Sequence, residues 1–107
     1  MFTSSPRIER LTALVQADSF NQSAHSLLGQ EYMREGRYME AAAKFRRVVE
    51  LNPESPDGWL MLGDAYEKVQ LFKEAESAYG TALTVAKRLN NKSISETAQE
   101  SLNRLAN

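Results

Sequence analysis

Apolar residues recur three or four positions apart along most of the chain, which is the spacing of one face of an α-helix. Leu28 and Tyr32 follow this spacing before the turn sequence REGRY, and Ala41 and Phe45 follow it afterwards. Gly36 lies in that turn, where the chain leaves one helix. The sequence LNPESP ends the second stretch, because proline disfavours helical geometry in the residue before it. The pattern predicts a helix, a turn, a second helix and a loop.

The same pattern returns when the sequence is shifted by 34 residues. Apolar character is kept even where identity is not, as in the pairing of Phe45 with Tyr79. A period of this length is typical of stacked helix–turn–helix units, each of which buries its apolar face against its neighbours. Identity is kept in Leu28 and Leu62, Gly29 and Gly63, Tyr32 and Tyr66, Glu40 and Glu74, and Ala41 and Ala75.

The two units resemble the tetratricopeptide repeat family, whose pattern runs aromatic, Leu-Gly, Tyr, Ala, aromatic, Ala and a closing Pro. Departures occur at His25 and Val48 in the first unit, where an aromatic residue and Ala are usual. The second unit departs at Lys87, where Pro is usual. The matching residues are Leu28, Gly29, Tyr32, Ala41, Phe45 and Pro53 in the first unit, and Trp59, Leu62, Gly63, Tyr66, Ala75, Tyr79 and Ala82 in the second.

This resemblance implies an all-α fold, namely a right-handed α-solenoid of antiparallel helix pairs with about six helices and no strands. Residues 1–107 are expected to form a single domain, in which repeat one covers residues 22–55 and repeat two covers residues 56–89. A helix over residues 6–18 should pack on the first repeat, and a capping helix over residues 93–106 should follow the second.

One glycine stands at the same place inside the first helix of each repeat, although glycine in a helix costs about 1 kcal/mol relative to alanine. Gly29 and Gly63 occupy the same place in the two repeats. We expect each to lie where the first helix of a repeat crosses the second, because a side chain there would hold the helices apart. The repeated aromatic residues, Trp59 among them, are expected to pack in the core rather than to form a ligand platform.

The ends of the helices carry their own signals. Ser5 followed by Pro6 is typical of a helix start. Ser93, followed three residues later by Glu96, matches a capping box and predicts the start of the last helix. Because repeat two lacks the closing proline, its second helix is expected to continue to about Arg88.

The turn inside repeat two has no glycine. Gln70 takes the position that Gly36 holds in repeat one. We therefore expect a positive φ at Gln70, a conformation that strains most residues other than glycine.

Composition narrows the classes of function. The chain has 13 basic and 14 acidic residues, a formal net charge of −1, which provides no electrostatic footprint for nucleic acid. It has no cysteine and a single histidine, which exclude disulfides, cysteine-based metal sites and a His-rich metal site. No cofactor is expected. Because the sequence shows neither a secretory signal nor a long apolar run, the cytoplasm is the default location.

An amphipathic membrane anchor is the alternative to packing for the first helix. Its polar face mixes Arg7 and Arg10 with Glu9, whereas helices that lie on membranes are strongly basic on that face. Packing is therefore favoured, and no membrane partner is expected.

The sequence contains no glycine-rich phosphate loop, no Gly-x-Ser-x-Gly elbow and no His-Glu-x-x-His helix. His25 with a carboxylate is the one acid–base pair the chain could offer, and it occupies an aromatic packing position. The basic residues Lys44, Arg46 and Arg47 have acidic neighbours and are interpreted as a solvated helix face. We expect a protein that is not an enzyme.

The resemblance places a concave binding groove along the first helix of each repeat. Met33 and Leu60 are apolar groove positions with Asp57, Asp64 and Glu67 nearby, which favours a peptide with an apolar anchor and a neighbouring Lys or Arg. The groove positions implied by the family are Ser23, Ser26, Gln30, Met33 and Arg34 in repeat one, and Asp57, Leu60, Asp64, Glu67 and Lys68 in repeat two.

The family's best-known ligand mode clamps a C-terminal carboxylate with Lys, Asn and Arg side chains. None of the five clamp positions matches, so binding of chaperone tails is not expected. These positions hold Ser26, Gln30, Met61, Asn91 and Ser95.

The leading hypothesis is a non-catalytic module that binds a peptide or a partner helix in the groove, with a partner whose identity the sequence does not give. The alternative is a structural scaffold that self-associates through its terminal helices or its convex face, as a weak homo-oligomer.

Overall fold

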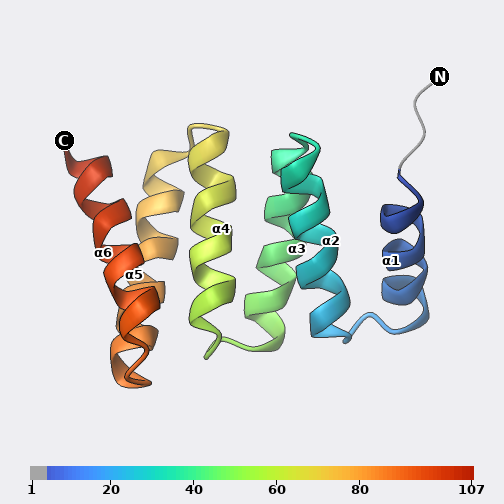
Figure 1. The fold of residues 1–107 in the computed structure, drawn as a ribbon, viewed down its shortest axis with the longest axis horizontal. Coiled ribbons are helices and arrows are strands. Elements are labelled where there is room, and N and C mark those ends of the chain that lie inside the picture. Colours follow the sequence, from blue (N-terminus) through green and yellow to red (C-terminus); the bar gives the residue numbers. More distant parts are fainter. Residues whose placement is uncertain (1–4) are drawn as a thin grey trace.

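The computed structural model describes residues 5–107, and these residues form six α-helices and no strand (Figure 1). The predicted all-α architecture is therefore confirmed. The helices are α1 (Pro6–Ala17), α2 (Gln22–Arg34), α3 (Tyr38–Leu51), α4 (Pro56–Lys68), α5 (Phe72–Arg88) and α6 (Lys92–Ala106).

Each helix packs mainly against its neighbours in sequence, which is the arrangement of an α-solenoid. In Figure 1, α2, α4 and α6 lie in front, α3 and α5 lie behind them, and α1 and α6 lie at opposite ends of the stack. The molecule is accordingly elongated, with extents of 41 × 28 × 19 Å. We call the surface formed by α2, α4 and α6 the front face.

The repeated glycines, Gly29 and Gly63, lie under aromatic rings, as the repeat predicts. A Cβ atom on Gly29 would lie 2.6 Å from the ring of Phe45, and one on Gly63 would lie 2.7 Å from the ring of Tyr79. Both rings are fully buried. The close approach of α2 to α3 and of α4 to α5 therefore depends on the missing side chains.

Trp59 is less deeply buried than a core residue. It is partly exposed and packs against the edge of the core, and its indole Nε1 donates a hydrogen bond to the Pro53 carbonyl oxygen at 2.8 Å. The indole therefore connects α4 to the loop before it as well as contributing apolar contact.

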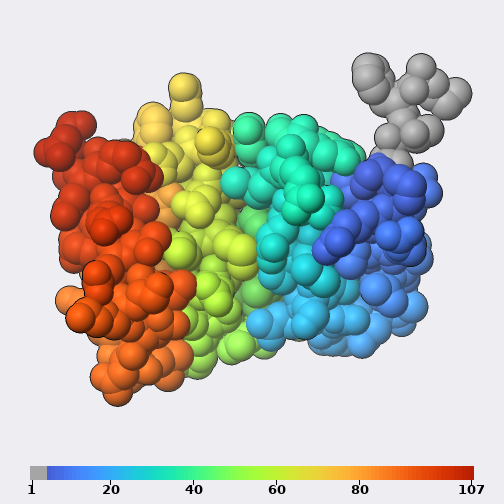
Figure 2. Space-filling model, viewed as in Figure 1, coloured from blue at the N-terminus to red at the C-terminus, as the bar shows by residue number. Residues whose placement is uncertain are grey.

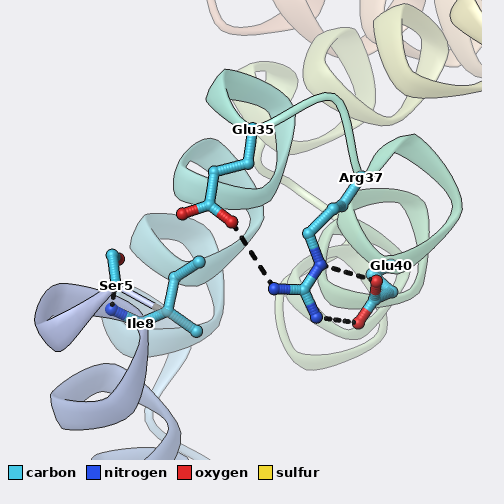
Figure 3. Close-up of polar contacts among 5 residues, drawn as sticks. All are labelled: Ser5, Ile8, Glu35, Arg37 and Glu40. Atoms are coloured by element: carbon cyan, nitrogen blue, oxygen red, sulfur yellow. Dashed lines mark hydrogen bonds and ion pairs between the residues drawn. The ribbon is translucent and has the colours of Figure 1, made fainter. Parts of the chain in front are cut away.

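The turn inside each repeat uses a residue with a positive φ. Gly36 has φ 75° and Gln70 has φ 64°, which confirms the expectation for Gln70. Next to Gly36, the Arg37 guanidinium pairs with Glu40 at 2.7 Å and with Glu35 at 3.5 Å (Figure 3), and it lies 4.5 Å from the centre of the Tyr32 ring. These contacts join the end of α2 to the start of α3.

The first helix packs against the first repeat. The Ser5 side chain accepts a hydrogen bond from the Ile8 amide at 3.2 Å (Figure 3), as expected of an N-cap. Ile8 and Leu11 are buried, and the Arg7 Nε lies 2.9 Å from the carboxylate of Glu31. The protein itself therefore covers Ile8 and Leu11 on the apolar face of α1, whereas Leu14 on the same helix is 49% exposed.

The prediction for the start of the last helix is wrong. α5 ends at Arg88, as expected, but the N-cap of α6 is Asn91 and not Ser93. Asn caps a helix as well as Ser does, and the Asn91 side chain accepts a hydrogen bond from the Ile94 amide at 3.1 Å. Glu96, the second member of the predicted capping box, instead lies 4.0 Å from the Lys92 ammonium.

Candidate binding groove

The front face is hollowed between α2 and α4 (Figure 2). This α2–α4 hollow has a volume of about 500 Å³ and lies at the N-terminal halves of the two helices. Its walls combine short polar side chains with three apolar ones. The lining residues are Gln22, Ser23, Ser26, Leu27, Gln30, Val48, Ser55, Asp57 and Met61.

A second hollow of about 560 Å³ lies toward the C-terminal ends of α4 and α6. We call it the α4–α6 hollow. Its walls carry two acidic, two basic and two apolar side chains and one amide. The lining residues are Met33, Asp64, Glu67, Lys68, Gln70, Phe72 and Arg104.

The ten groove positions implied by the family divide between these hollows, with two exceptions. Arg34 is exposed at the end of α2, 3.7 Å from the Glu31 carboxylate, and Leu60 is partly buried on α4 without lining either hollow. Met33 and Leu60 are therefore not brought together in one hollow. The α2–α4 hollow contains Ser23, Ser26, Gln30 and Asp57, and the α4–α6 hollow contains Met33, Asp64, Glu67 and Lys68.

Several lining residues were not among the expected groove positions. Leu27 and Met61 provide apolar surface in the α2–α4 hollow, and Leu27 is 38% exposed. These two residues stand 34 positions apart, so the repeat alignment contained the signal that they share a place in the two repeats. Phe72 and Arg104 reach the other hollow from α5 and α6. Phe72 stands 34 positions after Tyr38, whereas Arg104 lies beyond the two repeats.

A hydrogen-bonded group connects α4, α5 and α6 in the α4–α6 hollow. The Tyr79 hydroxyl lies 2.6 Å from Asp64 Oδ1 and 2.8 Å from Glu67 Oε1. Glu67 also accepts two hydrogen bonds from the Arg104 guanidinium, at 2.6 and 3.2 Å. Tyr79 is wholly buried, so its hydroxyl connects the carboxylates of the hollow to the core of the protein.

The two carboxylates of this group titrate differently. Burial raises the pKa of Asp64 above its ordinary value, and the hydrogen bond from Tyr79 only partly opposes this effect. The hydrogen bonds from Arg104 lower the pKa of Glu67. Burial, followed by the two adjacent carboxylates, raises the pKa of Tyr79, so the phenol remains a neutral donor.

Asp64→Asn is expected to melt at a higher temperature than the parent at pH 7. Because the folded pKa of Asp64 lies above its unfolded value, ionising this residue lowers stability as the pH rises through the interval between the two values. The gain should be full above the folded pKa and should vanish below the unfolded pKa, near 3.8. Thermal unfolding followed by circular dichroism across this pH range measures the difference.

Glu67→Gln is the matched control. The pKa of Glu67 is lowered in the folded parent, so Glu67→Gln should melt at a lower temperature than the parent at pH 7. This loss of stability should shrink as the pH falls through the folded pKa of Glu67. An Asp64→Asn variant that melts below the parent at pH 7 would contradict the assignment of Asp64 as a costly carboxylate.

The lone histidine lies outside both hollows. His25 is 4% exposed, and its Nε2 lies 2.9 Å from the Ser19 carbonyl oxygen. It therefore belongs to the packing between α2 and the loop that precedes it. Among residues 5–107, no three His, Asp or Glu side chains gather as a metal ion would require.

Within the same residues, every helix is too short or too polar to cross a membrane.

Comparison with known proteins gives one family. A family model described as Tetratricopeptide repeat matches residues 26–91, which include most of both repeats. No curated protein sequence matches the chain.

Solved structures with the same fold support this match. The first TPR of Spaghetti (RPAP3), bound to the HSP90 peptide SRMEEVD, is 21% identical with a TM-score of 0.80, and the match covers 92% of this chain and 74% of that one. The TPR2B domain of yeast Sti1, in a pHsp70 complex, is 15% identical with a TM-score of 0.84 and coverage of 92% and 79%. Protein BPP2914 from Bordetella parapertussis is 22% identical with a TM-score of 0.80 and coverage of 97% and 90%. These likenesses show a shared fold, and the family model, which spans more than half of the chain, shows that it belongs to the tetratricopeptide repeat family.

Proposed function

We propose that the protein binds an extended segment of a partner protein along its front face. The observation that carries this proposal is the pair of hollows on that face, most of whose lining residues come from α2 and α4, the first helices of the two repeats. Solenoids of this kind use the surface formed by their stacked helices for binding, and the family is in general a non-catalytic protein-interaction fold.

The α2–α4 hollow suits an apolar side chain of the partner. Leu27 and Met61 provide apolar contact there, while Ser26, Gln30 and Asp57 offer hydrogen-bonding groups at its rim. A few apolar contacts surrounded by polar groups are the usual composition of a peptide-binding site.

The ligand is proposed to differ from that of the similar solved structures. Two of those proteins bind a chaperone peptide or are found in a chaperone complex. The clamp positions of this chain, Ser26, Gln30, Met61, Asn91 and Ser95, include no Lys or Arg that could pair with a terminal carboxylate. An acidic C-terminal tail is therefore not the proposed ligand.

Peptides selected from a phage-displayed random library test the proposal. A selected peptide should bind the parent, and Leu27→Glu should weaken that binding by at least about tenfold, because it places a charge in the apolar part of the hollow. Fluorescence polarisation of the labelled peptide measures the affinity.

Met39→Glu is the matched control for Leu27→Glu. Met39 is also an exposed apolar residue, at 57%, but it lies on α3 outside both hollows. Its replacement should change the affinity by less than about twofold. Equal weakening by both variants, or no weakening by Leu27→Glu, would contradict binding at the front face.

Self-association is the second candidate. Leu14 on α1 is 49% exposed and Phe20 in the following loop is 72% exposed, so the N-terminal end of the solenoid presents apolar surface. The other end is polar, because Lys92, Glu96 and Glu100 are exposed on α6. Sedimentation at increasing concentration separates the candidates, since a stable dimer would favour self-association and a monomer would favour the binding module.

A further inference from the structure

We propose, on the basis of the front-face binding above, that the α4–α6 hollow accepts a Lys or Arg side chain of the partner at Asp64, with an adjoining apolar side chain against Met33 and Phe72. The proposal names the chemistry of the partner that this half of the groove fits.

Asp64 is the carboxylate of the hollow that has no ion-pair partner within 4.0 Å among residues 5–107, and Arg104 and Lys68 act on it only from longer range. Glu67 is paired with Arg104 at 2.6 Å, and the Lys68 ammonium lies 5.9 Å from the centre of the Tyr38 ring. In the part of the chain that the structure describes, no Lys, Arg or His nitrogen lies within 4.0 Å of the Asp64 carboxylate. The carboxylate is left with the neutral Tyr79 hydroxyl as its partner.

The hydroxyl cannot satisfy both of its acceptors. Tyr79 has a single hydroxyl hydrogen, but oxygens of Asp64 and Glu67 lie 2.6 and 2.8 Å from it. Glu67 has Arg104 as a second donor, and Asp64 has no second donor among the described side chains. An ammonium or guanidinium from a ligand would supply the missing hydrogen bond to Asp64.

The cost of this unpaired carboxylate supports the same conclusion. Burial raises the pKa of Asp64, so the ionised carboxylate lowers the stability of the free protein at neutral pH. A cation placed beside it would remove this cost in the complex. Charge complementarity of this kind contributes to the choice of partner as well as to affinity.

The apolar residues of the α4–α6 hollow are the reason for proposing an apolar residue beside the Lys or Arg of the partner. Phe72 is 52% exposed at the start of α5, and Met33 is partly buried at the end of α2. Both line the same hollow as Asp64, whose volume of about 560 Å³ lies within the range of ligand sites. A basic residue next to an aliphatic or aromatic one would therefore use both parts of the hollow.

Two parallel selections from the random phage library, one on the parent and one on Asp64→Asn, test this inference. Peptides selected on the parent should be enriched in Lys or Arg beside an apolar residue, and peptides selected on Asp64→Asn should lose the basic enrichment. A single parent-selected peptide should bind Asp64→Asn at least about tenfold more weakly, and this difference should shrink at high salt. Asp64→Asn should still melt no lower than the parent at pH 7, which excludes unfolding as the cause.

Glu76→Gln is the matched control, because Glu76 is an exposed carboxylate on α5 outside both hollows. The affinity of Glu76→Gln for the peptide should stay within about twofold of the affinity of the parent. Peptides that depend on Leu27 but carry no basic residue, or that bind Asp64→Asn as tightly as the parent, would overturn the inference and leave the proposed function standing. Peptides indifferent to Leu27→Glu, or no selected peptides at all, would count against both.

Discussion

Truncation of Phe45 to alanine is expected to lower the free energy of unfolding by about 3 to 5 kcal/mol. The side chain is 1% exposed, and its ring occupies the space that Gly29 leaves open between α2 and α3. The truncation would create a cavity at the centre of repeat one, in a protein whose total stability is of the order of 5 to 15 kcal/mol. Chemical denaturation followed by circular dichroism measures the change.

Phe72→Ala provides the comparison for Phe45→Ala. Phe72 is the same residue type, but it is 52% exposed at the start of α5. Its truncation should cost less than about 1 kcal/mol. If the two variants lose similar stability, Phe45 does not fill the core in the way the structure shows.

Leucine in place of Gly63 is expected to destabilise the protein by about 1 to 3 kcal/mol or more. The Cβ atom alone would lie 2.7 Å from the Tyr79 ring, which is too close for contact, and the rest of the leucine side chain would add to the overlap. Because Tyr79 is wholly buried, its ring has little room to move. The melting temperature of the variant should fall clearly below that of the parent.

Gly80 provides a control for the helical glycines. It also lies inside a helix, but a Cβ atom there would meet nothing within 4 Å. Gly80→Ala should therefore be neutral or stabilising by up to about 1 kcal/mol, because alanine favours the helix. An unchanged melting temperature in Gly63→Leu would show that the helices of repeat two do not approach closely at Gly63.

The helices and their crossings could be predicted because each depends on local or repeated signals. The alignment of Gly29 with Gly63 and of Phe45 with Tyr79 indicated the contacts that the structure shows. The positive φ of Gln70 followed from its equivalence to Gly36 in the other repeat. The 34-residue period was informative because equivalent positions in the two repeats make equivalent contacts.

The groove could be predicted only in part. The groove positions implied by the family included Leu60, whereas its neighbour Met61 is the residue of α4 that lines the α2–α4 hollow. The surroundings of Asp64 depend on Tyr79 from α5 and on Arg104 from α6 through Glu67. Arg104 lies beyond the matched repeats, so no equivalent position in the other repeat indicated its contact.

Mapping a selected peptide onto the protein by NMR tests the central claim most directly. Amide chemical shifts of the labelled protein should change most on α2 and α4, around Ser26, Gln30 and Met61, when the peptide is added. A different hollow of about 340 Å³, lined by residues of α3, α4 and α5 that include Trp59 and Ser77, provides the competing surface. Changes concentrated around Trp59 and Ser77, with α2 unaffected, would contradict binding at the front face.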